Sequence, residues 1–184
     1  MAERVLIVVD MLNDFVHPDG KLYCGQSAQA IIEPSRKIIE HFRAKKDPII
    51  YLQDSHSPDD LEFQMFPPHA IKGTWGCAII EELSPRAGEA VVPKTRFSGF
   101  FRTDLEQRLE AISSTLPHKP EVWVIGVCTS ICVMDTVADL RNRDYPVVVV
   151  LDAVSDFDQE MHECALKRME RVYKVKFVKS GEIV

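Results

Sequence analysis

The strongest constraint on the fold comes from four apolar runs rich in β-branched residues: Val5–Val9, Pro48–Leu52, Val122–Ile125 and Val147–Leu151. Each run is continuously apolar rather than alternating, which is typical of parallel strands covered on both faces. A fifth run, Val175–Val178, alternates with lysines, and we expect it at a sheet edge. The sequence therefore predicts a mostly parallel sheet of five to six strands.

Amphipathic segments separate these runs and predict helices. Ile38, Ile39 and Phe42 share one helical face, and Pro34 fits the first turn of that helix. Three further helices are expected, one from Thr103, one from the N-cap residues Thr129–Ser130 to Arg141, and one from Gln159 to Val172. Strands that alternate with helices imply right-handed βαβ crossovers and a Rossmann-like α/β fold, a three-layer α/β/α sandwich.

Length, charge and cysteine content narrow the functional classes. The 184 residues fit one compact domain, residues 1–184. Acidic residues outnumber basic ones by 28 to 22, and the net charge of −6 argues against binding to nucleic acid or anionic membranes. No apolar run approaches the ~18 residues of a membrane span. The chain starts without a signal-peptide pattern, and its five irregularly spaced cysteines fit reduced thiols, so we expect a cytoplasmic protein.

Three residues at expected strand ends form a first candidate site. In sheets of this kind the chemistry collects at the carboxyl ends of the central strands. Asp10, Lys94 and Cys132 each follow an apolar segment. Alone they would be a strand-ending carboxylate, a surface lysine and a small buried thiol. Together they describe a base, a cation and a nucleophile, with Cys132 near a helix start that favours the thiolate.

A second candidate site lies in the segment from Asp54 to Pro93, which is long for a loop inside a compact domain. Imidazoles and carboxylates are suitable ligands for a borderline divalent ion such as zinc, iron(II) or manganese. Four such side chains fall within sixteen residues: Asp54, His56, Glu62 and His69. The pattern predicts a metal site, although polar surface loops also collect Asp and His.

At this point the sequence resembles a known family over most of its length. The matching segments, in order, are 8–15 (VVDMLNDF), 53–56 (QDSH), 66–74 (FPPHAIKGT), 94–100 (KTRFSGF) and 126–133 (GVCTSICV). They are similar to the isochorismatase-like cysteine hydrolases and, within that superfamily, to the nicotinamidases. The Asp-x-His…His set is what narrows the resemblance, because simpler members of the superfamily generally lack it.

The resemblance implies an activity and a role for each candidate residue. It implies that nicotinamide is hydrolysed to nicotinate and ammonia through a thioester, a step of NAD salvage. The implied residues are the triad Asp10, Lys94 and Cys132; the metal ligands Asp54, His56, Glu62 and His69; and the ring-binding aromatics Phe15, Phe66 and Phe97. The implied cofactor is one divalent ion, with zinc placed before iron and manganese.

The turn before the nucleophile departs from the family pattern. Where the family often has Gly-Val-Ala-Thr-Asp, this chain has Gly126-Val-Cys-Thr-Ser130. The resemblance implies a cis peptide between Val127 and Cys128, and an oxyanion hole formed by the N–H groups of Cys128 and Cys132. A redox role for these two cysteines ranks low, because no Cys-x-x-Cys spacing is present. Cys24, Cys77 and Cys164 receive no role.

Two alternatives remain open from the sequence. One is another hydrolase of the same superfamily that acts on a carbamoyl, ureido or vinyl-ether substrate, with the triad but no use for the metal loop. The other is a binding module in which the triad is inert. The expected partner is a small aromatic carboxamide, with no nucleic acid and no membrane. The sequence does not choose between a monomer and a homo-oligomer, nor does it fix the breadth of aromatic amides accepted.

Overall fold

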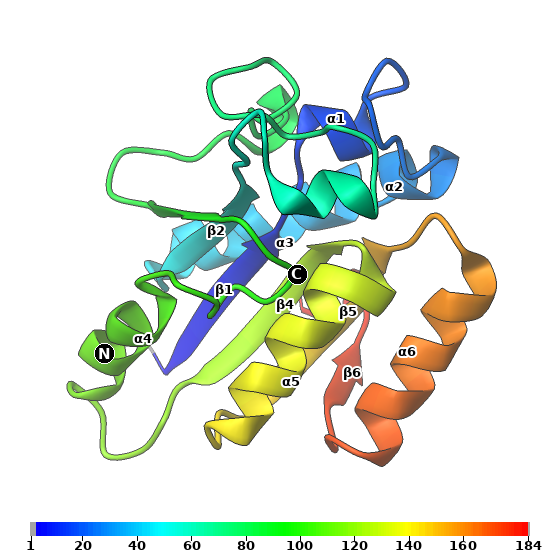
Figure 1. The fold of residues 1–184 in the computed structure, drawn as a ribbon. Helices are drawn as coiled ribbons and strands as arrows, with labels where there is room; N and C mark the ends of the chain where they lie inside the picture. The colour runs from blue at the N-terminus through cyan, green and yellow to red at the C-terminus, as the bar shows by residue number, and fades with distance from the viewer. Residues whose placement is uncertain (1–2, 184) are drawn as a thin grey trace.

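The sheet is six-stranded and entirely parallel in the computed structural model, which describes residues 3–183 (Figure 1). The strand order is β3-β2-β1-β4-β5-β6. The strands are β1 (Arg4–Val9), β2 (Ile49–Asp54), β3 (Ala90–Lys94), β4 (Glu121–Val127), β5 (Val147–Ser155) and β6 (Lys176–Val178). The predicted parallel sheet is confirmed, and the last apolar run forms the edge strand β6, as expected.

Strand β1 shows why the runs are continuously apolar. Its side chains alternate between two separate core clusters: Leu6 and Val8 lie in one, and Val5, Ile7 and Val9 lie in the other. All five are buried. Because both faces of the sheet are covered, neither face of a central strand can carry polar side chains at low cost.

Helices cover the two faces in the predicted three-layer arrangement (Figure 1). One face packs against α1 (Asn13–Val16), α2 (Gln26–Ala30) and α3 (Ile32–Lys45), and the other packs against α4 (Leu105–Ser113), α5 (Met134–Asn142) and α6 (Gln159–Arg171). The predicted apolar face of α3 is buried through Ile38, Ile39 and Phe42. Helix α4 begins two residues after Thr103, the expected start.

The predicted helix does begin at Thr129, but Thr129 and Ser130 are not its N-cap. The first turn is π-helical, η3 (Thr129–Val133), with Cys128 as the N-cap, and α5 follows it. The Cys128 carbonyl accepts from the N–H groups of both Ile131 and Val133, at 3.1 Å each, which widens the turn. The Ser130 N–H donates to the Asp156 carboxylate at 2.7 Å, so the polar cap comes from the end of β5.

The long segment between β2 and β3 folds over the carboxyl ends of the strands. It contains two short 3₁₀ helices, η1 (Leu61–Gln64) and η2 (Glu81–Leu83). The Asp60 carboxylate caps η1 by accepting the Glu62 N–H at 2.9 Å. His56 pairs with Ile71 in an isolated bridge, which holds the start of the segment against its middle. A loop of this length is therefore ordered by its own contacts over the sheet edge.

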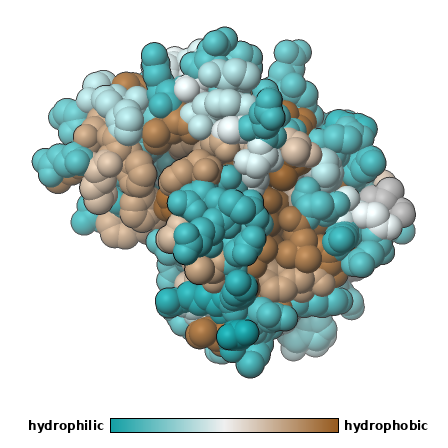
Figure 2. All heavy atoms as spheres, turned by 90° about the vertical axis from the view of Figure 1, so that its right-hand side faces the viewer, coloured by the Kyte–Doolittle hydropathy of each residue, from teal (hydrophilic) through white to brown (hydrophobic). Residues whose placement is uncertain are grey.

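The surface carries some apolar side chains among the charged ones. Phe157, Met161 and Val172, in or beside α6, are each more than half exposed. Figure 2 shows apolar residues gathered among hydrophilic ones on the side of the molecule that carries α6. Within residues 3–183, none of the helices is both long and apolar enough to cross a membrane.

Candidate active site

Four adjacent strands bring the candidate catalytic side chains to one edge of the sheet. Asp10 follows β1, Asp54 ends β2, Lys94 ends β3, and Cys132 lies in η3 after β4. Asp54 and Lys94 are direct partners in the β2–β3 ladder. In a parallel sheet, neighbouring carboxyl ends face the same side, so residues far apart in the sequence meet there.

Lys94 links these side chains. Its Nζ lies 2.7 Å from Asp10 Oδ2, 2.6 Å from Asp54 Oδ1 and 3.5 Å from Cys132 Sγ. The side chain is buried. Burial alone would lower the pKa of Lys94, but the charges of Asp10 and Asp54 raise it well above its ordinary value. Lys94 therefore stays an ammonium beneath the thiol.

Asp10 is held in a fixed orientation beside this ammonium. Its backbone has a φ of 48°, and its Oδ1 accepts the Asp54 N–H at 2.9 Å. Burial and the Asp54 charge raise the pKa of Asp10 to about 7, against the opposing effect of Lys94. A carboxyl that titrates near neutrality can accept a proton and return it at similar cost, which suits a general acid–base group.

Burial and the Lys94 ammonium act in opposite directions on Cys132. Burial raises the pKa of Cys132, and the nearby Lys94 charge lowers it, with burial the larger effect. One atom from each of Asp10, Asp54 and Cys132 lies within 4.8 Å of the others, so a carboxylate is close enough to accept the thiol proton.

A second cluster joins the four predicted metal ligands. One ligand atom from each of Asp54, His56, Glu62 and His69 lies within 4.8 Å of all the others. Asp54 Oδ2 is 3.6 Å from His56 Nε2, and Glu62 Oε1 is 3.9 Å from each histidine Nε2. Ligand atoms about 2.0–2.2 Å from a tetrahedral ion lie about 3.3–3.6 Å apart, so the 3.6 Å spacing matches such an ion and the 3.9 Å spacings are about 0.3 Å wider than its upper limit.

The histidines are oriented as metal ligands usually are. His56 Nδ1 lies 3.1 Å from Asp60 Oδ2, and His69 Nδ1 lies 2.8 Å from the Pro67 carbonyl oxygen. These acceptors favour a proton on each Nδ1 and leave each Nε2 lone pair facing the cluster. His56 Nε2 and Glu62 Oε2 are buried without a hydrogen-bond partner among the described residues. The residues thus fit a divalent ion.

Burial and neighbouring charges shift the pKa values of the side chains in this cluster. Burial raises the pKa of Asp54, but Lys94 and His56 outweigh it and hold the pKa below its usual value. Burial and the Asp54 charge raise the pKa of Glu62. Burial lowers the pKa of His69, which favours the neutral imidazole, whereas at His56 the Asp54 and Asp60 carboxylates outweigh burial and raise the pKa. Two buried carboxylates at this distance repel each other, and a bound cation would offset that repulsion.

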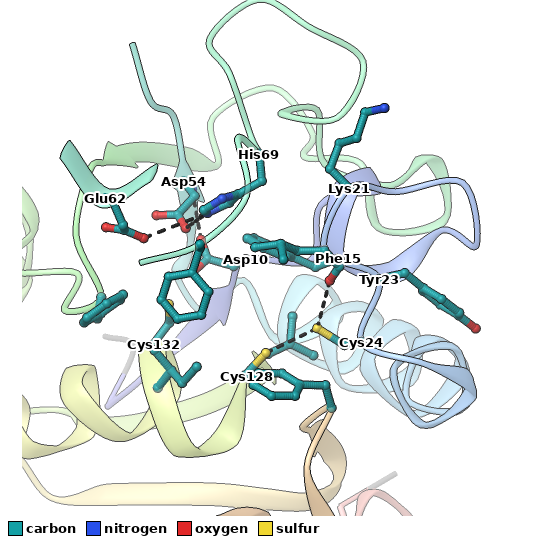
Figure 3. A pocket seen from close by; sticks show the side chains of 16 residues that line it. Asp10, Phe15, Lys21, Tyr23, Cys24, Asp54, Glu62, His69, Cys128 and Cys132 are labelled. Carbon is teal, nitrogen blue, oxygen red and sulfur yellow. Dashed lines mark hydrogen bonds and ion pairs between the residues drawn. The ribbon is translucent and has the colours of Figure 1, made fainter. Parts of the chain in front are cut away.

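Both clusters face one pocket of about 370 Å³ (Figure 3). Apart from the buried His56 and Lys94, the sequence-predicted site residues line it: Asp10, Phe15, Asp54, Glu62, Phe66, His69, Phe97, Cys128 and Cys132. Phe15 and Phe66 both lie against His69, with ring centroids 5.5 and 6.3 Å from the imidazole. The implied cis peptide between Val127 and Cys128 is present.

Comparison with known proteins identifies the family. The sequence profile of the Isochorismatase domain matches residues 4–178, nearly the whole chain. This chain belongs to the isochorismatase family. It is therefore a hydrolase of that family, and the resemblance stated from the sequence motifs is confirmed.

Solved structures of the isochorismatase family cover this chain almost completely. N-carbamoylsarcosine amidase from Thermoplasma acidophilum is 38% identical with a TM-score of 0.87, covering 100% of this chain and 99% of its own. The nicotinamidase PncA from Bacillus subtilis is 32% identical with a TM-score of 0.89, covering 96% and 99%. A pyrazinamidase from Pyrococcus horikoshii, solved in complex with zinc, is 28% identical with a TM-score of 0.87, covering 96% and 99%.

Sequence analysis missed part of this isochorismatase-family pocket. The additional lining residues are Lys21, Leu22, Tyr23, Cys24, Val127, Ile131 and Phe157. Residues 21–24 lie in an irregular segment between α1 and α2, whose sequence has no hydrophobic periodicity from which its position could be predicted. Phe157 lies just beyond the carboxyl end of β5, where pocket residues are expected. It was missed because β5 runs to Ser155, four residues beyond the apolar run that predicted the strand.

Proposed function

We propose that this protein is a metal-assisted cysteine amidohydrolase that converts nicotinamide into nicotinate and ammonia. One observation carries the proposal: the Asp10–Lys94–Cys132 group and the two-histidine, two-carboxylate cluster adjoin the same pocket and share the Asp54 side chain between them. A nucleophile needs only the first group. The histidine–carboxylate cluster favours a pyridine amide as the substrate, because a pyridine ring nitrogen is a good ligand for a divalent ion held there.

Substrate binding would use both walls of the pocket. A divalent ion held by Asp54, His56, Glu62 and His69, zinc before iron or manganese, would supply a Lewis-acid anchor for the pyridine nitrogen. Phe15 and Phe66, which both lie against His69, would contact the ring, and Phe97 packs edge-on against Phe66 with centroids 6.2 Å apart. The carboxamide would then point toward Cys132.

The chemistry would proceed through an acyl-enzyme. Asp10 takes the thiol proton, and the Cys132 sulfur attacks the amide carbon. The N–H groups of Cys128 and Cys132 stabilise the oxyanion, while Lys94 balances the charges beside it. Asp10 gives its proton to the departing ammonia, and the same carboxylate activates the water that hydrolyses the thioester.

Ammonia release from nicotinamide by the metal-loaded protein tests this proposal. Cys132→Ala should abolish turnover, because no second nucleophile stands beside Asp10 and Lys94 in the described structure. Cys164→Ser is the matched control, since this cysteine is exposed on α6 and should retain full activity. Substantial turnover by Cys132→Ala would contradict the covalent route. Full activity of metal-stripped protein would contradict the role of the four ligands.

A second candidate is hydrolysis of an N-carbamoyl compound. It is supported by the 38% identity to N-carbamoylsarcosine amidase. This candidate keeps the triad but gives the histidine–carboxylate cluster no role. A parallel assay with N-carbamoylsarcosine separates the two: nicotinamide should be the better substrate by kcat/KM, and the reverse order would favour the second candidate.

A further inference from the structure

Two cysteines from distant parts of the chain face each other in the pocket wall. Cys24 Sγ lies 3.3 Å from Cys128 Sγ, although 104 residues separate them in the sequence. Both residues are buried, and both line the pocket that holds Cys132 (Figure 3). The proposed reaction uses the backbone of Cys128 but neither of these two thiols. Their contact therefore needs an explanation of its own.

Backbone contacts hold the two sulfurs in this arrangement. The Cys24 N–H donates to the Phe15 carbonyl at 2.8 Å, and the Cys24 carbonyl accepts the Ser27 hydroxyl at 3.1 Å. Cys128 is fixed by the η3 turn, as described above. A disulfide has an S–S distance of about 2.05 Å, so the sulfurs need to approach by only about 1.2 Å. Because both thiols line the pocket, a small oxidant that enters it meets the pair.

We propose that Cys24 and Cys128 form an oxidation site, at which a hydroperoxide converts the two thiols into a disulfide in the pocket wall. In the first step, one thiol reduces the peroxide O–O bond and becomes a sulfenic acid, with release of water from hydrogen peroxide. In the second step, the other sulfur attacks the sulfenic sulfur. The S–O bond breaks, the S–S bond forms, and a second water carries away the remaining thiol proton.

The disulfide should also stop catalysis, a consequence that rests on the proposed function. The N–H of Cys128 is one of the two proposed oxyanion donors, and an S–S bond would draw this residue toward Cys24. A displacement of about 1 Å at a catalytic group can cost about 100-fold in rate. Oxidation should therefore reduce amidase activity by about that factor, and a thiol reductant should restore it.

Mass analysis tests the oxidation site without any substrate. The Cys132→Ala/Cys164→Ser protein, treated with hydrogen peroxide, retains only Cys24, Cys77 and Cys128. It should lose two hydrogen atoms, and a digest without reductant should contain the peptide pair joined through Cys24 and Cys128. The same protein with Cys24→Ser added should show neither change. A treated protein without this link, or with Cys77 linked instead, would overturn the proposal.

Activity measurements test the consequence. Peroxide treatment, followed by removal of the peroxide, should reduce the activity of Cys164→Ser about 100-fold, and dithiothreitol should restore it. Cys24→Ser/Cys164→Ser cannot form the disulfide and should lose clearly less activity under the same treatment, the loss that remains being oxidation of Cys132, which lines the same pocket. Equal losses in the two proteins would overturn the effect on catalysis, because oxidation of Cys132 would then account for both. If untreated protein does not hydrolyse nicotinamide, the proposed function fails while the mass result still decides the oxidation site.

Discussion

Lys94 is a buried ammonium between two carboxylates and a sulfur, and its removal takes the ammonium partner away from both Asp10 and Asp54. Breaking a buried ion pair by removing one partner costs about 3–5 kcal/mol. Lys94→Met should therefore lower the free energy of unfolding by about that amount, measured by urea denaturation of the metal-free protein.

Lys37→Met is the control for this prediction. Lys37 lies on the exposed face of α3, with its side chain 52% exposed, so its loss should change the free energy of unfolding by less than about 0.5 kcal/mol. If the two variants were equally stable, the ammonium would contribute nothing to holding the carboxylates together, and its role in the site would need revision.

Asp60 acts on the metal cluster through His56. Its Oδ2 lies 3.1 Å from His56 Nδ1, which fixes the ring and directs Nε2 toward the other ligands. Loss of such an outer partner typically weakens metal binding about 10–100-fold. Asp60→Asn should show this loss when zinc binding is titrated against a competing chelator. Asp59→Asn, at the exposed neighbouring residue, should bind zinc as the unaltered protein does.

The sequence predicted which side chains meet at the sheet edge wherever a reactive residue follows a recognisable strand. Asp10, Lys94 and Cys132 could be placed together because each follows a recognisable apolar run, and their contacts agree with that placement. The effect of burial on the pKa of Cys132 could not be predicted, because it depends on how deeply the sulfur is buried. Cys24 was missed as well: nothing in its local sequence indicates that its partner lies 104 residues away.

At the scale of elements, the approach of β4 to β1 depends on Gly126. This residue has a φ of 118°, and a Cβ built there would lie 2.0 Å from the Val9 carbonyl oxygen. Backbone strain at a left-handed position costs about 1–3 kcal/mol even without a clash. Gly126→Ala should therefore destabilise the protein by at least about 3 kcal/mol in urea denaturation and reduce amidase activity by displacing η3.

Gly181→Ala provides the comparison for Gly126. Gly181 lies in the short helix η4 (Ser180–Glu182), and a Cβ there would meet no atom of the described chain within 4 Å. The unfolding free energy of this variant should stay within about 0.5 kcal/mol of the original. Equal stability of the two glycine variants would show that the sheet tolerates a wider gap between β1 and β4.

The elements themselves were largely predictable, and the exceptions have a common cause. Strands buried on both faces and amphipathic helices leave strong periodic signals, so the sheet and α3 were found from the sequence. The π geometry of the first turn after β4, with Cys128 as its N-cap, was not, and there Asp156, directly after β5, accepts the Ser130 N–H. Tertiary contacts thus decide the geometry of the turn that carries the nucleophile.

At the scale of the whole molecule, the metal cluster should contribute to stability as well as to catalysis. Asp54 and Glu62 are buried close together, and the raised pKa of Glu62 reflects that burial and the Asp54 charge. An ion that binds only the folded chain stabilises it by about 2.7 kcal/mol at a free concentration of 100 Kd. For a chain of this size, each kcal/mol raises the Tm by about 2–4 °C.

Zinc at 100 Kd should therefore raise the Tm of the metal-free protein by about 5–11 °C in a calorimetric scan. His69→Ala removes one ligand from the cluster, so its Tm should respond to the same zinc concentration much less. Iron(II) and manganese measured in parallel would rank the three ions by the shift each produces. If zinc raised the Tm of His69→Ala as much as that of the unaltered protein, the stabilising ion would bind elsewhere on the molecule. An ion held by all four side chains must bind more weakly when one of them is removed.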